Sequence, residues 1–167
     1  VPDDYGTIQE AIDASQDGDI IIVSENTYYE SIDFKNKEIL VSSTDPNDWD
    51  VVSATVINGN GAAITVKAAT GAQLIKSSQL SGFTVTGGNY GVCSKYLNRL
   101  VISNCIISGN NDHGVECNDG GFGTIQNCII KDNVNMGVYI GSGASATIAN
   151  SSIYGSKIGV YLDYAII

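Results

Sequence analysis

Apolar residues alternate with polar or small residues in many short runs along this chain. One face of such a run carries Cys105 and Ile107, and an equivalent run carries Cys128 and Ile130. A period of two is the signature of a β-strand, because successive side chains point to opposite faces. Gly, Asn, Asp and Ser separate the runs, as expected of tight turns. The pattern therefore predicts many short strands and no helix within the repeating part of the chain.

One short sequence motif occurs three times in the second half of the chain. Its copies occupy residues 102–107, 125–130 and 148–153, so equivalent positions lie 23 residues apart (125 − 102 and 148 − 125). A Gly-Val pair recurs at nearly the same spacing, with its glycines at Gly91, Gly114, Gly137 and Gly159. Two independent markers with one period predict a repeat protein in which each unit forms one coil.

Stacked coils place equivalent residues above one another at a spacing of about 4.8 Å. Asn104, Asn127 and Asn150 are then predicted to form a ladder in which each amide bonds to its copy in the next coil. Asn110 and Asn133 are candidates for a second, shorter ladder. A simple turn role is the alternative for these asparagines, because Asn tolerates left-handed backbone.

Residues 7–14 predict a helix ahead of the first coil. Thr7 can cap this helix, and Glu10 stands three residues later in the capping-box position. The open end of a solenoid exposes its core and unpaired strand edges, so we expect the helix to cover that end. Its apolar stripe consists of Ile8, Ala11 and Ile12. The first core strand is expected at Ile20–Val23, an unbroken apolar run.

These features carry a family resemblance. The repeated Ile-x-Asn-Cys-Ile-Ile, followed by Gly-Val-Tyr or Gly-Val-x-Cys, resembles the right-handed parallel β-helix repeat of pectin-lyase-like proteins. Residues 1–14, 17–23 and 27–30 resemble the cap helix and first strand of that family. The resemblance implies an all-β fold, a single-stranded right-handed parallel β-helix with an N-terminal capping helix. It implies no one activity, because the family includes lyases, epimerases, hydrolases, phage spikes and non-catalytic surface proteins.

The domain organisation follows from the repeats. We expect one domain over 1–167, with irregular first coils over 20–79 and regular coils of 22–23 residues over 80–167. Within the irregular part, 44–50 is predicted to be a polar excursion and 67–78 a longer loop or distorted strand. The sequence ends on apolar residues without a polar cap, so we expect either a fragment of a longer chain or end-to-end self-association.

The charge balance excludes two classes of partner. Eighteen acidic residues face eight basic ones, giving a net charge of −10. Nucleic acid and anionic membrane surfaces require a cationic face, which this composition does not provide. No apolar run is long enough for membrane insertion. Few lysines, with many Asp, Asn, Ser and Thr residues, are typical of secreted and cell-surface modules.

The four cysteines admit two interpretations. Cys105 and Cys128 hold the same repeat position, and a spacing of about 4.8 Å lies within disulfide range. Parallel Cβ vectors suit a disulfide poorly, so stacked core thiols are favoured while a disulfide stays open. Cys117 is expected to face inward and Cys93 outward. The absence of a Cys-x-x-Cys pair disfavours a structural metal site.

The resemblance also implies where chemistry would occur. Carbohydrate-acting members of the family use the outer face of a parallel sheet, with a base, a cation near the substrate carboxylate and often Ca²⁺. The candidate catalytic residues here are His113, Glu116, Asp119 and Lys131. His113 shares its repeat position with apolar residues, so a residue at the edge of the core is the alternative to a general base. Because no catalytic motif of the family can be matched residue by residue, the enzyme interpretation is weakened.

Three smaller predictions concern ligands. Glu116, Tyr139 and Tyr161 should form one outward column, suited to sugar rings or simply to aromatic pairing between coils. Arg99, expected in a loop, could meet an acidic sugar together with Lys95. Oxygen ligands from Asp112, Glu116 and Asp119 are a candidate Ca²⁺ site, although no known calcium motif is present, and no other cofactor is expected.

Together these observations predict an extracellular or cell-surface β-helix module with a structural or glycan-binding role. The alternative is a polysaccharide lyase or hydrolase that acts on the outer face of the parallel sheet. A net charge of −10 disfavours a polyanionic substrate unless Ca²⁺ bridges protein and polymer.

Overall fold

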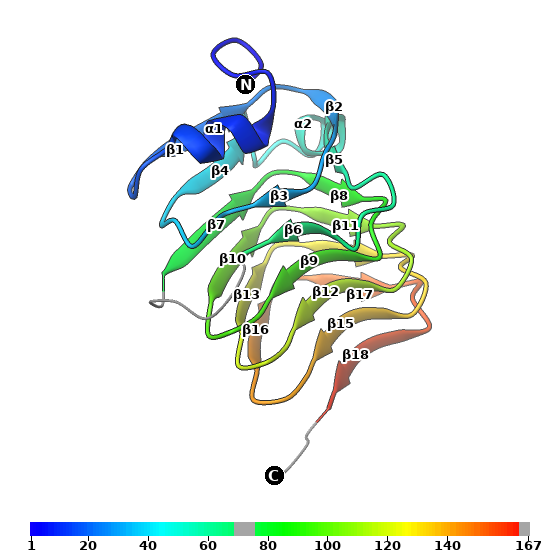
Figure 1. The fold of residues 1–167 in the computed structure, drawn as a ribbon. Coiled ribbons are helices and arrows are strands. Elements are labelled where there is room, and N and C mark those ends of the chain that lie inside the picture. The colour runs from blue at the N-terminus through cyan, green and yellow to red at the C-terminus, as the bar shows by residue number, and fades with distance from the viewer. Residues whose placement is uncertain (69–75, 164–167) are drawn as a thin grey trace.

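The chain forms a stack of coils, each built from three short strands, and the computed structural model describes residues 1–68 and 76–163 (Figure 1). The described residues form three parallel six-stranded sheets that run along the stack. Sheet A contains β1 (Ile20–Val23), β4 (Leu40–Ser43), β7 (Ser77–Ser81), β10 (Arg99–Ser103), β13 (Phe122–Gln126) and β16 (Ser145–Ala149). Sheet B contains β2 (Asn26–Tyr29), β5 (Thr55–Asn58), β8 (Thr84–Thr86), β11 (Ile106–Ser108), β14 (Ile129–Lys131) and β17 (Ser152–Tyr154). Sheet C contains β3 (Ile32–Asp33), β6 (Ile64–Lys67), β9 (Tyr90–Ser94), β12 (His113–Cys117), β15 (Met136–Ile140) and β18 (Ile158–Leu162).

The repeat spacing seen in the sequence is the register of the sheets. Ile102 pairs with Leu80 in the coil before it and with Ile125 in the coil after it. Ile107 pairs in the same way with Ile130. The predicted parallel β-helix is therefore confirmed, and the coils before residue 80 follow the same three-sheet plan.

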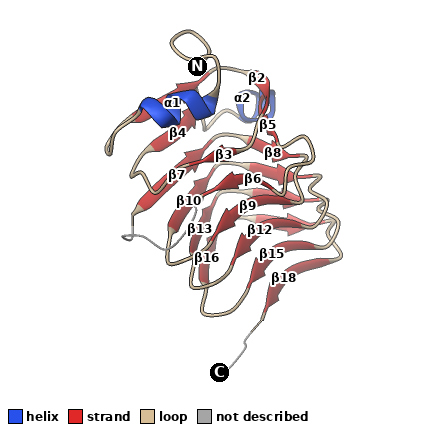
Figure 2. Ribbon diagram, in the orientation of Figure 1, coloured by secondary structure: helices blue, strands red, loops and turns tan. Residues whose placement is uncertain are grey.

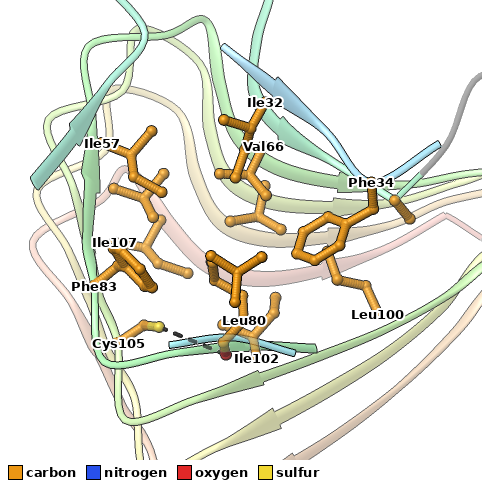
Figure 3. Close-up of a cluster of buried hydrophobic side chains, with 14 of the residues drawn as sticks. Ile32, Phe34, Ile57, Val66, Leu80, Phe83, Leu100, Ile102, Cys105 and Ile107 are labelled. Atoms are coloured by element: carbon orange, nitrogen blue, oxygen red, sulfur yellow. Dashed lines mark hydrogen bonds between the residues drawn. The ribbon is translucent and has the colours of Figure 1, made fainter. Parts of the chain in front are cut away.

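The interior of the stack is a continuous apolar column. Side chains from all three sheets point toward one another there, among them Ile57, Ile107, Val66 and Leu80 (Figure 3). Each of these four side chains is fully buried. Burial of this kind contributes roughly 1.5–3 kcal/mol for each large aliphatic side chain, so the core supplies most of the stability.

The repeated glycines mark a close approach between successive coils. A Cβ atom added to Gly91 would lie 2.6 Å from the carbonyl oxygen of Gly114, and one added to Gly114 would lie 2.7 Å from that of Gly137. Added Cβ atoms at these two positions would also lie 2.9 and 2.8 Å from the Ile107 and Ile130 side chains, respectively. The Gly-Val pair recurs because the backbone of the next coil occupies the space that a side chain would need at the glycine position.

The predicted capping helix is present as α1 (Ile8–Ala14), which lies at the N-terminal end of the stack (Figure 1). The hydroxyl of Thr7 accepts a bond from the Glu10 amide at 3.1 Å, and the Glu10 carboxylate accepts one from the Thr7 amide at 3.2 Å. The predicted capping box is therefore confirmed. The predicted apolar stripe faces the first coil, where its three members are buried: Ile8, Ala11 and Ile12.

Two charged side chains fasten α1 to the coil beneath it. The carboxylate of Glu30 accepts bonds from the Ile8 and Gln9 amides, both at 3.0 Å. At the other end, Lys37 Nζ donates to the carbonyls of three residues: Ile12, Asp13 and Ser15. A carboxylate at the N-terminus and an ammonium at the C-terminus both oppose the helix dipole, so the charges stabilise the cap.

The expected first core strand is present as β1, where Ile21 and Val23 are buried in the core. Ile20 and Ile22 are 63% and 49% exposed, so the first strand has one buried face rather than two. The outer side chains of this strand are exposed, whereas the buried runs of α/β proteins are covered on both faces. In addition, the polar excursion over 44–50 leads directly into a short helix, α2 (Trp49–Ala54), which Asp48 caps. Both helices lie near the N-terminal end of the stack (Figure 2).

The expectation for 67–78 falls partly on residues 69–75, which lie outside the described residues. On either side, β6 ends at Lys67 and β7 begins at Ser77. The apolar end at 164–167, on which the self-association prediction was based, also lies outside the described residues.

Asparagine side chains do pair between coils, but at the second of the two predicted sets of positions and not at the first. Asn104, Asn127 and Asn150 occupy equivalent turns, but no hydrogen bond joins their side chains among the described residues. Each instead has a left-handed backbone, with φ of 53°, 52° and 50°. The tight turn between sheets A and B requires this conformation, so the turn role holds for these three. The shorter ladder is confirmed: Asn110 Nδ2 donates to Asn133 Oδ1 at 2.9 Å.

All four cysteines are buried and carry free thiols. Cys105 and Cys128 hold equivalent positions, and the Ile129 amide bonds to the carbonyl of Cys105 at 2.9 Å. Their Sγ atoms donate to the carbonyls of Ser103 and Gln126, at 3.1 and 3.2 Å. Of the two interpretations left open by the sequence, the structure shows stacked thiols rather than a disulfide.

Candidate functional site

The outer face of sheet C carries a polar and aromatic column that runs through every coil. Successive pairs along it include Cys93 with Glu116, Glu116 with Tyr139, and Tyr139 with Tyr161. The predicted column of Glu116, Tyr139 and Tyr161 is therefore confirmed. Asp33 and Lys67 begin the column and form an ion pair at 3.3 Å.

Four rings stack along this face, the last two of them from the column, and we call them the ring stack: Tyr90, His113, Tyr139 and Tyr161. Their centroids are separated in turn by 5.3, 5.1 and 5.9 Å. The last two contacts are nearly parallel, with interplanar angles of 19° and 9°. Each inner ring is therefore flanked by rings on both sides, and Tyr161 at the end of the stack is exposed.

The sequence missed this stack because the strict alternation breaks at a glycine. The period of two predicts that His113 faces the same way as Val115, which is buried in the core. The His113 ring instead packs on Tyr139, a residue of the outward column. A Cβ on Gly114 would point at Ile130 in the interior, so an inward glycine precedes the inward valine and His113 is turned outward. Tyr90 at the equivalent position is the signal that could have revealed the stack.

Glu116 lies beneath the surface, only 4% exposed. Lys95 Nζ lies 3.0 Å from Glu116 Oε1, and Asn118 Nδ2 donates to the same oxygen at 3.3 Å. Cys93 Sγ lies 3.8 Å from Oε2. Burial lowers the pKa of Lys95, but the bond to Glu116 and the attraction of the acidic groups around it together raise the pKa above its ordinary value. The carboxylate is thus neutralised by a partner, which reduces its availability as a general base.

His113 is 9% exposed, and its Nδ1 lies 3.1 Å from Asp112 Oδ1. The two atoms are not aligned for a hydrogen bond, so this buried nitrogen has no bonded partner among residues 1–68 and 76–163. The same Asp112 oxygen accepts a bond from Asn135 Nδ2 at 3.1 Å. A carboxylate so close to an imidazole is also found in the Asp–His pairs that orient a catalytic histidine.

The predicted calcium ligands do not form a compact oxygen cluster. Among residues 1–68 and 76–163, no group of three His, Cys, Asp or Glu residues could hold a metal ion. Asp112 contacts His113, and Glu116 is bound to Lys95. Asp119 follows β12 in a turn with left-handed backbone, φ 49°. The Ca²⁺ prediction therefore gains no support from the geometry.

Two predicted site residues lie on other sheets. Lys131 ends β14 in sheet B, so it belongs to a different face from Glu116. Arg99 begins β10 in sheet A rather than lying in a loop, and its guanidinium carbon is 5.3 Å from the Phe122 ring centroid. Because Lys95 is bound to Glu116 on sheet C, the predicted pair of Arg99 and Lys95 does not form one site.

One polar residue of the site had no sequence signal. Tyr139 Oη donates to Asp163 Oδ2 at 3.1 Å. Burial, followed by this bond to a carboxylate, raises the pKa of Tyr139. Asp163 follows the last strand of sheet C, and only the stacking of the coils brings it to the ring stack.

Among the described residues, none of the helices is long and apolar enough to span a bilayer. Comparison with curated proteins and with solved structures finds no match. The family model described as "Right handed beta helix region" matches residues 15–165, which is nearly the whole chain. The same architecture is seen in the sheets and in their register. The chain therefore belongs to the right-handed β-helix family.

Proposed function

We propose that this β-helix is a non-catalytic binding module that holds a glycan chain against the outer face of sheet C. The observation that carries the proposal is the ring stack, which runs parallel to the axis of the coils. A surface that repeats with the spacing of the coils suits an extended polymer, because equivalent contacts can be made along its length.

The chemistry of this face fits hydroxyl-rich ligands. Tyr161 is 40% exposed, and the carboxylates of Asp112 and Asp163 lie beside the rings. Aromatic side chains supply apolar contact area with a polar tip, and carboxylates accept bonds from hydroxyl groups. Because the rings cover one another, a sugar would contact their edges and hydroxyls rather than lie flat on each face.

The charge narrows the class of glycan. A net charge of −10 repels polyuronates and sulfated polymers over long range. Neutral polysaccharides avoid that cost, so they are the proposed ligands. The same composition, with few lysines, supports the proposal that the module is secreted or displayed at a cell surface.

Affinity electrophoresis through gels that contain neutral polysaccharides tests the proposal. The unmodified chain should be retarded by at least one neutral polymer, and Tyr161→Ala should lose that retardation. Tyr154→Ala is the matched control, because Tyr154 is 52% exposed in the same coil but belongs to sheet B. Equal retardation of both variants, or none for the unmodified chain across the panel, would refute the sheet C site.

The alternative function is a polysaccharide lyase or hydrolase on the same face. The observation that favours it is the close approach of Asp112 and His113, since a paired imidazole is a common general base. Purified protein can be incubated with pectate, alginate and neutral glycans, with absorbance of unsaturated products and release of reducing ends as readouts. Turnover that His113→Ala abolishes would establish the enzyme and contradict the non-catalytic proposal.

A further inference from the structure

The outer face of sheet A contains a shallow depression that is separate from the ring stack. It has a volume of about 310 Å³ and crosses β7, β10, β13 and β16. Its lining combines hydroxyl side chains with a few apolar ones: Ser77, Val101, Phe122, Thr124, Ser145 and Thr147. Such a volume lies at the lower end of the range of about 300–1,000 Å³ for small-ligand sites.

Arg99 stands at the rim of this depression and is the only arginine in the chain. It forms no ion pair with any carboxylate among residues 1–68 and 76–163, and residues 69–75 and 164–167 contain no Asp or Glu. Most lysines differ in this respect, since Lys35, Lys67, Lys76 and Lys95 each pair with a carboxylate. The guanidinium of Arg99 is therefore available to bind an anionic group of a ligand, although the chain as a whole carries a net charge of −10.

The guanidinium is also held in place. Arg99 and Phe122 are register partners on adjacent strands, and the ring lies beneath the guanidinium carbon at 5.3 Å. A cation–π contact at an exposed site contributes roughly 0.5–1 kcal/mol, enough to favour one side-chain position. The planar donors of Arg match a carboxylate in a two-point contact, which a lysine cannot reproduce.

We infer that the sheet A depression binds a saccharide unit that carries one carboxylate. Arg99 binds the acid group, and the hydroxyls of Thr124, Ser145 and Thr147 bind the sugar hydroxyls. A single acid group suits this site better than a polyanion, because one arginine offers one positive charge on an acidic protein. The site does not depend on the ring stack of sheet C, which takes neutral sugar in the proposed function.

Titration followed by ¹⁵N–¹H correlation spectra tests the inference, with glucuronate and glucose as matched probes at constant ionic strength. Glucuronate should shift the amides of Val101, Thr124 and Thr147 in a saturable manner, and glucose should do so at least about tenfold more weakly, because it lacks the acid group. Arg99→Gln should weaken glucuronate binding about ten- to a hundredfold, with Arg99→Lys intermediate.

Lys157→Gln is the control variant, because Lys157 is exposed and has no ion pair among the described residues; it should bind glucuronate normally. Tyr161→Ala should also keep the sheet A shifts, which separates this site from the glycan site on sheet C. Three results would overturn the inference: no saturable shifts with glucuronate, equal affinity for glucose, or undiminished binding by Arg99→Gln.

Discussion

Asn110 and Asn133 form a buried amide pair one coil apart, in which Asn110 Nδ2 donates to Asn133 Oδ1 at 2.9 Å. The same oxygen accepts the Asn110 backbone amide at 3.1 Å, and Asn133 Nδ2 donates to the Ile107 carbonyl at 3.1 Å. The two side chains are 0% and 1% exposed. The pair thus satisfies backbone groups at the turn between sheets B and C that water cannot reach.

Replacement of this amide should be costly. Asn133→Ala removes three hydrogen bonds and leaves the buried backbone amide of Asn110 without its acceptor, so we expect a loss of about 2–4 kcal/mol in the free energy of unfolding. Urea denaturation measures the loss. Asn127→Gly is the control, because Asn127 is exposed with φ 52° and glycine tolerates that backbone, so its stability should change little. Equal stability of Asn133→Ala and the unmodified chain would contradict the ladder.

The repeated glycines of the Gly-Val pairs allow a steric test of how closely successive coils approach each other. Gly114→Ala places a Cβ 2.7 Å from the Gly137 carbonyl oxygen, a contact that only a backbone shift can relieve. We expect it to lower the free energy of unfolding by about 1–3 kcal/mol. Gly159→Ala, at the equivalent position of a later described coil, meets no described atom closer than Ile153 at 3.9 Å, so it should be tolerated. Thermal melts should therefore show a lower melting temperature for Gly114→Ala than for Gly159→Ala. Similar melting temperatures would show that the close approach of the next coil does not require glycine at position 114.

The attachment of the capping helix depends on Lys37. Lys37→Met removes three bonds to the C-terminal carbonyls of α1, so we expect destabilisation of about 1–2 kcal/mol and faster exchange of the α1 amides. Hydrogen exchange measured residue by residue would detect it. Lys157→Met, which changes an exposed lysine at the other end of the stack, should leave α1 protection unchanged. Loss of protection in both variants would indicate a general charge effect.

Stability should fall on the alkaline side of neutrality. Burial raises the pKa of Cys117 to about 12, and it also raises the pKa of Cys93 and Tyr90. An unfolded thiol releases its proton near pH 8.5. Above that pH the unfolded state therefore binds fewer protons than the folded state, so the free energy of unfolding falls as pH rises from about 8.5 toward about 12.

Urea midpoints between pH 7 and 11, measured with a reductant present, should show this decline. Cys117→Ala should flatten part of it, although the variant itself is less stable at pH 7 because it leaves a small cavity. A midpoint that stays constant up to pH 11 in the unmodified chain would contradict the burial of these thiols.

The sequence by itself determined how the coils of this protein stack along the axis of the β-helix. The repeat of 23 residues states which residues are neighbours in successive coils, so the sheets, the capping helix and the column of Glu116, Tyr139 and Tyr161 could be predicted. A period is a local property of the chain, and parallel pairing converts it directly into register.

Only the tertiary structure decided which side chains meet around that axis. Lys95 reaches Glu116 from the preceding coil, His113 turns outward beside Gly114, and Arg99 has no carboxylate partner within the described part of the chain. These contacts depend on two features: the lack of space for a side chain at the repeated glycines, and the turn conformations that direct each long side chain. Neither is encoded in the alternation of apolar and polar residues, because that alternation assigns a residue to a face without placing its charged end.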